Sequence, residues 1–107
     1  MTISFAKSNY GSSSNDTWKN ISGDYTAASG DRLAVDTSKG PVTVFLPAKP
    51  SKNDFVEFTD FMKTFTTNPL FINPNGGNID GDNTVSEVNE YSTLFGLIFN
   101  GTRWVDY

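Results

Sequence analysis

The sequence predicts an all-β protein, a small antiparallel β-sandwich or barrel-like domain with an extended N-terminal arm. Three observations favour this class. The aromatic fraction is 14% and consists of residues that suit pleated sheets. Apolar and polar residues alternate over several short segments, and turn-forming residues separate these segments. At 107 residues the chain has length for one domain with one modest core.

The arm is predicted at residues 1–22 and the β-sandwich domain at residues 23–107. Residues 1–22 are rich in Ser, Asn and Thr, so they bury too little apolar surface to fold as a free unit. Their scattered apolar side chains do not form a helix face but could anchor the arm on another surface. The predicted partner-binding residues are Ile3, Phe5 and Trp18, and the stretch ISFA could add as a strand to an exposed sheet edge.

Within the domain, the first alternating segment contains Leu33 and Val35, and the second runs from Val42 to Leu46. The sequence between them, DTSKG, favours a turn, so we predict a hairpin that turns at residues 37–40. Pro47 then ends the second strand.

Two further strands are predicted at residues 54–58 and 70–73. Between them, Phe58, Phe61 and Phe65 have a helix-like spacing, so a short helical turn and an irregular or strand-like segment are both open interpretations. Residues 73–83 are dense in Asn, Gly and Asp and are predicted to form a loop.

The C-terminal region carries the strongest hairpin signal, Asn100-Gly101 between two apolar runs. The run LFGLIF, residues 94–99, leaves no polar face for water, which predicts that both of its faces are covered. A domain of this size has few residues left to cover the second face of this strand. We therefore expect a neighbouring subunit to cover it in a homotrimer. The predicted core comprises Leu33, Val35, Val42, Val44, Leu46, Val56, Phe58, Ile72, Leu97, Phe99 and Trp104.

Composition argues against several functions. The chain has no Cys and no His, which removes the usual ligands of zinc, haem and iron–sulfur clusters, and we expect no cofactor and no enzymatic activity. The net charge of −4 without a basic patch disfavours nucleic acid as a partner. No stretch approaches the apolar length of a membrane helix, and no secretory signal is evident, so we expect synthesis in the cytoplasm and no membrane insertion.

Two constellations of polar residues allow a functional interpretation. Asn78, Asp80 and Asp82 follow the register of a calcium-binding loop, but the register then fails, and an ordinary polar turn is the favoured alternative. A carboxylate-dependent hydrolase is the remaining enzymatic interpretation, although nothing in the sequence sets the separation that its carboxylates would need. Its candidate residues are Glu57, Asp60, Glu87 and Glu90.

An ordered set of short motifs spans residues 23–105. It runs through GDYTAASGDRLAVDTSKGPVTVFLPAKP, DFVEFTD, PLFIN, NGGNIDG and LIFNGTRW. This order resembles the short β-rich modules of tail-fibre and accessory virion proteins of tailed bacteriophages. Asn53 stands where such modules usually carry Gly, and FMKTFTT replaces a polar, glycine-rich turn.

The resemblance implies a virion structural protein, either a head decoration or fibre component or a small tail-fibre or adaptor module. Such a protein is made in the host cytoplasm, resides in the virion, contacts other virion proteins, here through the N-terminal arm, and commonly forms trimers. No catalytic residues come with the resemblance. The alternative is an adhesin that binds a host-surface glycan or protein receptor through loops such as residues 73–83.

Overall fold

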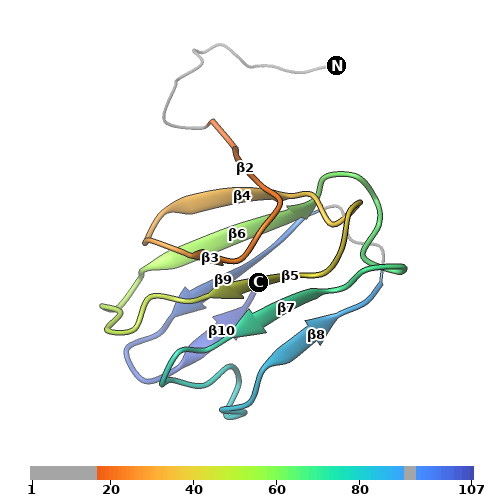
Figure 1. Cartoon of the computed structure of the whole chain (residues 1–107). Coiled ribbons are helices and arrows are strands. Elements are labelled where there is room, and N and C mark those ends of the chain that lie inside the picture. Colours follow the sequence, from red (N-terminus) through yellow and green to blue (C-terminus); the bar gives the residue numbers. More distant parts are fainter. Residues whose placement is uncertain (1–16, 91–93) are drawn as a thin grey trace.

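The computed structural model describes residues 17–90 and 94–107, and over these residues the chain is all-β, with no helix. The strands form two mixed sheets (Figure 1). Their buried side chains meet in one core between the sheets. The strands are β2 (Lys19–Ile21), β3 (Tyr25–Thr26), β4 (Asp31–Val35), β5 (Val42–Phe45), β6 (Phe55–Asp60), β7 (Leu70–Asn73), β8 (Ser86–Val88), β9 (Phe95–Phe99) and β10 (Trp104–Asp106).

The chain alternates between the two sheets from β2 to β7. The five-stranded sheet has the order β10-β9-β6-β4-β2, and the four-stranded sheet has the order β3-β5-β7-β8. Strand β4 pairs in parallel with both β2 and β6, and β5 pairs in parallel with both β3 and β7. Each passage through both sheets therefore adds one strand to each of them. We call residues 19–73 the coil, because the chain winds repeatedly from one sheet to the other here; the name does not refer to irregular structure.

The prediction of an antiparallel domain with a hairpin at residues 37–40 is wrong for the coil. Strands β4 and β5 lie in different sheets, and the segment between them crosses from one sheet to the other. The predicted turn chemistry is present there, since Asp36 Oδ1 accepts hydrogen bonds from the amide and hydroxyl of Ser38. Alternation shows which side of a strand is buried, but a strand that turns into the opposite sheet has the same alternation as one that folds back on its neighbour.

The C-terminal strands are antiparallel, as predicted. Strand β9 pairs with β6 and with β10, and Phe99 lies opposite Trp104. The hairpin loop is longer than the predicted turn at residues 100–101, because it includes residues 100–103. Asn100 holds this loop: its Oδ1 accepts hydrogen bonds from the amides of Thr102 and Arg103.

The core between the sheets contains all the residues predicted for it. All of them are buried except Phe99, which is partly buried and packs against the others. The ring of Phe58 stacks on Phe95 with centroids 5.0 Å apart, and the ring of Phe99 meets Trp104 edge-on at 5.5 Å. Phe65 and Leu70, which were not predicted to be buried, are also fully enclosed.

The two interpretations of the phenylalanine spacing are each partly correct. Residues 61–69 form an irregular series of turns with no helix, but they include one helical turn, in which the Thr64 carbonyl accepts hydrogen bonds from the amides of Thr67 and Asn68. Asp60, 1% exposed, accepts hydrogen bonds from the amides of Thr64 and Phe65. These bonds turn the chain so that Phe65 enters the core, whereas Phe61 is 50% exposed.

Of the predicted arm, the structure describes residues 17–22, and here β2 forms the outer strand of the five-stranded sheet with Ile21 buried. Residues 1–16 lie outside the described residues. In residues 17–90 and 94–107, no helix has the length and apolar character needed to cross a bilayer.

Candidate functional site

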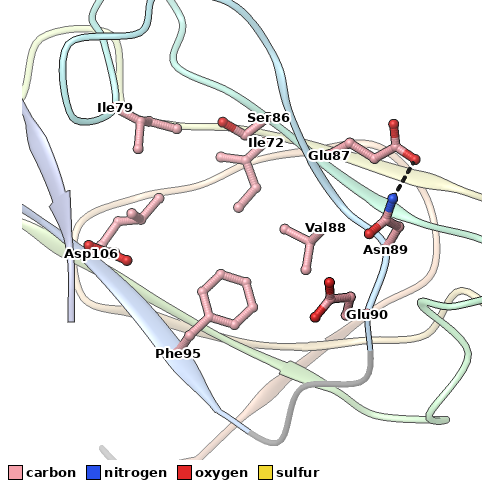
Figure 2. Close-up of a pocket in the computed structure, with 10 residues that line it drawn as sticks. Ile72, Ile79, Ser86, Glu87, Val88, Asn89, Glu90, Phe95 and Asp106 are labelled. Atoms are coloured by element: carbon pink, nitrogen blue, oxygen red, sulfur yellow. Dashed lines mark hydrogen bonds between the residues drawn. The ribbon is translucent and has the colours of Figure 1, made fainter.

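The candidate site is a cleft of about 450 Å³ between the edges of the two sheets. It lies between β8 on one side and β9 and β10 on the other (Figure 2). This volume is within the range of pockets that hold small ligands or a few side chains of a partner. The lining consists of Ile72, Ile79, Ser86, Glu87, Val88, Asn89, Glu90, Phe95, Leu97 and Asp106.

The floor of the cleft is apolar because alternate residues of the flanking strands face inward. Ile72 and Leu97 are nearly buried in the core, and Val88 and Phe95 are partly buried and pack against it. Figure 2 shows Ile72, Val88 and Phe95 pointing into the same space. At this end of the molecule the sheets therefore leave Val88 and Phe95 partly accessible above the buried side chains of Ile72 and Leu97.

Carboxylates lie at the margin of this floor. Glu90 and Asp106 are exposed and stand on different sides of the cleft (Figure 2). Glu87 belongs to the outer face of its sheet, opposite Phe71, and its Oε2 accepts a hydrogen bond of 3.4 Å from Asn89 Nδ2. An apolar floor between two carboxylates favours a ligand that combines apolar groups with a positive charge.

The structure does not bring the candidate hydrolase carboxylates together. Glu57 lies on the outer face of the five-stranded sheet, where Arg32 Nε is 3.0 Å from its Oε1 and the Tyr107 hydroxyl donates to its Oε2 at 2.8 Å. Asp60 is buried beneath the turns that follow β6. Of the four candidates, only Glu87 and Glu90 line the cleft.

The loop at residues 73–83 forms one end of the cleft through Ile79. Its polar side chains accept hydrogen bonds from its own turns: Asn78 Oδ1 from the Gly81 amide, and Asp82 Oδ1 from the amide and hydroxyl of Thr84. The Thr84 bonds hold the pKa of Asp82 below its ordinary value. The interpretation of this loop as an ordinary polar turn predicts that Asn78 and Asp82 accept such local hydrogen bonds. Among the described residues, no group of three or more acidic side chains is placed to hold a metal ion.

The predicted partner-binding residues are not at the cleft as far as the structure describes them. Trp18 is partly buried and precedes β2, at the opposite edge of the five-stranded sheet from β10. Ile3 and Phe5 lie outside the described residues. The cleft itself was missed by sequence reasoning. The signal for it was the run LFGLIF, which has no polar face and contributes Phe95 and Leu97 to the lining, but the sequence does not show that β8 lies opposite them.

Polar residues of the motifs that resemble bacteriophage modules shape connections away from the cleft, whereas the apolar motif residues Ile72, Ile79 and Leu97 line it. The Tyr25 hydroxyl donates to Asp31 Oδ2, and the same oxygen accepts the Ala28 amide. The Ser51 amide donates to Asp54 Oδ2, and Asn53 adopts a left-handed conformation with φ of 78°. Asn53 therefore has the backbone geometry for which glycine is usually needed.

The chain matches no protein-family model, and no curated protein matches it significantly.

Proposed function

We propose that the chain is a structural component of a tailed-bacteriophage virion, a head decoration or fibre component or a small tail-fibre or adaptor module, that acts through protein–protein contacts. The observation that supports the proposal is the placement of the polar motif residues. They hold turns and crossings of the coil through short hydrogen bonds, such as those of Asp31 and Asp54. A motif used in this way specifies a scaffold, which is the role expected of a particle component.

The edge formed by β2 and β3 supports association through the backbone. These strands end their sheets in the described part of the chain, and each pairs in parallel with the next turn of the coil. An edge strand presents unpaired amide and carbonyl groups to a further strand. A neighbouring chain can therefore extend the sheets at this edge.

The outer face of the five-stranded sheet supports a covering subunit. Phe55 and Val105 both lie opposite Ile98, so these three side chains form a row on that face, and all three are partly exposed. Leu94, at the start of the same run, is 56% exposed. An apolar row of this kind favours a protein partner, and we propose a homotrimer that also contacts other virion proteins through the arm at residues 1–22.

The test is the presence of the chain in purified particles and its dependence on the arm. The full chain should be detected in particles by mass spectrometry and located by imaging. A variant lacking residues 2–16 should keep the melting temperature of the β-domain but load onto particles poorly. A matched control replaces residues 8–16 with a Gly/Ser sequence of equal length and should load normally, because this stretch is expected to act as a spacer.

Two results would contradict the proposal. Absence of the full chain from particles would remove the virion assignment. Equal loading of the shortened and full chains would show that the arm is not the anchor, and would assign docking to the β-domain surface.

A second candidate function is an adhesin module for a host-surface receptor. It is favoured by one observation, that the loop at residues 73–83 borders a cleft in which Phe95 lies near the exposed carboxylates of Glu90 and Asp106. Retention of the purified protein on a glycan array or on host cells, lost in Glu90→Gln, would support it. If the full chain is retained neither on the glycan array nor on host cells, the adhesin function is excluded.

A further inference from the structure

The cleft lies beside an unpaired strand edge. Strand β8 ends the four-stranded sheet, and none of the strands in the described residues pairs with its outer side. Its inward residues, Ser86 and Val88, line the cleft. A segment added along this edge would gain backbone hydrogen bonds and would also place every second side chain on the apolar floor.

The chain contains a segment with matching chemistry near its N-terminus. In TISFAK, residues 2–7, the side chains of Ile3, Phe5 and Lys7 would share one face of an extended strand. Two of them are apolar and the third is positively charged. This order of side chains, two apolar and then one basic, matches the cleft, whose apolar floor ends at the carboxylate of Glu90.

We propose that residues 2–7 of a second copy of this chain bind as an added strand along β8, parallel to it. In this register Ile3 lies beside Ser86, Phe5 beside Val88, and Lys7 reaches Glu90. Figure 2 shows the Glu90 carboxylate on the cleft side, near Phe95. The inference rests on the proposed structural role and assigns residues 2–7 to the contact between copies, which leaves the remainder of the arm for contacts with other virion proteins.

The ends of the sheets indicate why the occupant is a second copy. The N-terminal segment joins the molecule at β2, whereas β8 and β10 are the edge strands at the other end of their sheets. Four strand spacings of about 4.8 Å separate β2 from β10 by roughly 19 Å. Residues 8–16 span at most about 30 Å, so the arm can reach β8 of its own chain only by running back, nearly extended, across the whole molecule. Head-to-tail binding needs no such return.

Head-to-tail binding also has a consequence for symmetry. Each copy gives one arm and receives one, so the contact is heterologous and produces a closed ring if the rotation between copies closes. A ring of three such contacts is the proposed homotrimer. The arm contact and the apolar row of Phe55, Ile98 and Val105 are separate surfaces, so they can be tested separately.

The experiment measures the mass of the full chain by light scattering and sedimentation over a range of concentrations. The unmodified chain should be trimeric at micromolar concentration. Phe5→Ser should be monomeric under the same conditions, with an unchanged circular dichroism spectrum. Lys7→Glu and Glu90→Lys should each weaken the association about tenfold, because each replaces an attraction with a repulsion. The double variant should recover most of the affinity.

Matched controls fix the contact to one carboxylate. Glu87→Lys makes the same charge change three residues earlier, within β8, where the side chain of Glu87 lies on the outer face of its sheet. Lys7→Glu should therefore not rescue it. Lys49→Glu makes the same charge change as Lys7→Glu at an exposed loop position and should leave association unchanged.

Several outcomes would overturn the inference. A full chain that is monomeric would exclude binding between copies, and an arm that docks within its own chain would give this result. A trimer that survives Phe5→Ser would show that another surface makes it. Rescue of Glu87→Lys by Lys7→Glu would show that the charge effect is not specific to the cleft. In each of these cases, detection of the chain in purified particles would still leave the proposed function standing.

Discussion

Replacing Asp60 should destabilise the domain strongly, although the residue lies outside the cleft. Its carboxylate is 1% exposed and accepts hydrogen bonds from the amides of Thr64 at 2.9 Å and Phe65 at 3.1 Å. These bonds hold the turn that carries Phe65 into the core. Asp60→Ala leaves both amides without this acceptor and loosens the position of a fully buried ring.

The size of the effect follows from the two hydrogen bonds. A bond to a charged group contributes about 1.5–3 kcal/mol, so two would contribute about 3–6 kcal/mol. The Thr64 amide is only partly buried and can bond to water after the substitution, so the lower end of the range, about 3 kcal/mol, is expected. For a domain of roughly 100 residues, the melting temperature should fall by about 12–24 °C. Asp60→Asn keeps one acceptor oxygen, so its melting temperature should lie between those of the unmodified chain and Asp60→Ala.

The assay is chemical and thermal unfolding followed by circular dichroism or tryptophan fluorescence. Asp54→Ala is the matched control, because Asp54 also accepts a backbone amide, from Ser51 at 2.8 Å, but does so at the surface. It should lose no more than about 1 kcal/mol. Equal losses for Asp60→Ala and Asp54→Ala would refute the argument that burial makes the Asp60 bonds strong.

Three further predictions concern side chains at the surface. Burial, and then the hydrogen bond to Glu57, raise the pKa of Tyr107 to about 12, so Glu57→Gln should lower this pKa in an absorbance titration, and no change would contradict the contact. The hydroxyl and amide of Ser38 lower the pKa of Asp36 from 3.8. The ionised carboxylate therefore stabilises the fold above this pH, and the contribution is lost as the pH falls through the lowered pKa. Ser38→Ala should raise the Asp36 pKa in a carboxyl NMR titration, and an unchanged value would exclude Ser38 as the cause. A Cβ at Gly96 would collide with the Tyr107 ring, so Gly96→Ala should displace the ring, cost about 1 kcal/mol and lower the Tyr107 pKa. A Tyr107 pKa that stays at its original value would show that the ring had not moved.

The buried faces of the strands were predictable from the sequence, whereas the pairing of the strands was not. Val42, Val44 and Leu46 alternate with polar or less buried residues, and this pattern alone identifies the face that meets the core. It does not distinguish a parallel from an antiparallel neighbour, because both leave the period of two unchanged. Hydrogen bonds between residues distant in sequence carry that information. The link from Asn68 Nδ2 to the Thr37 carbonyl is one of them.

The candidate site was less predictable than the core. Glu90 and Asp106 are far apart in sequence, with strand β9 between them, and no neighbouring residue marks either of them as part of a cleft. They border the same space only because β8 follows β7 in one sheet while β9 and β10 follow β6 in the other. The sites of the turns were easier to predict, since Asn100 and Gly101 impose their conformation locally.

The coil makes the length of this molecule adjustable in whole steps. Leu33 pairs with Phe58, and Val44 pairs with Ile72. A copy of residues 31–54 inserted after Asp54 would repeat β4, β5 and both of their crossings, and would therefore add one parallel strand to the middle of each sheet. The β2 edge and the cleft would keep their own residues and move apart by about 4.8 Å, the spacing of neighbouring strands. Related chains that differ by such an insertion would present the same two ends at different separations, so the coil would act as a spacer that sets the repeat distance of an assembly.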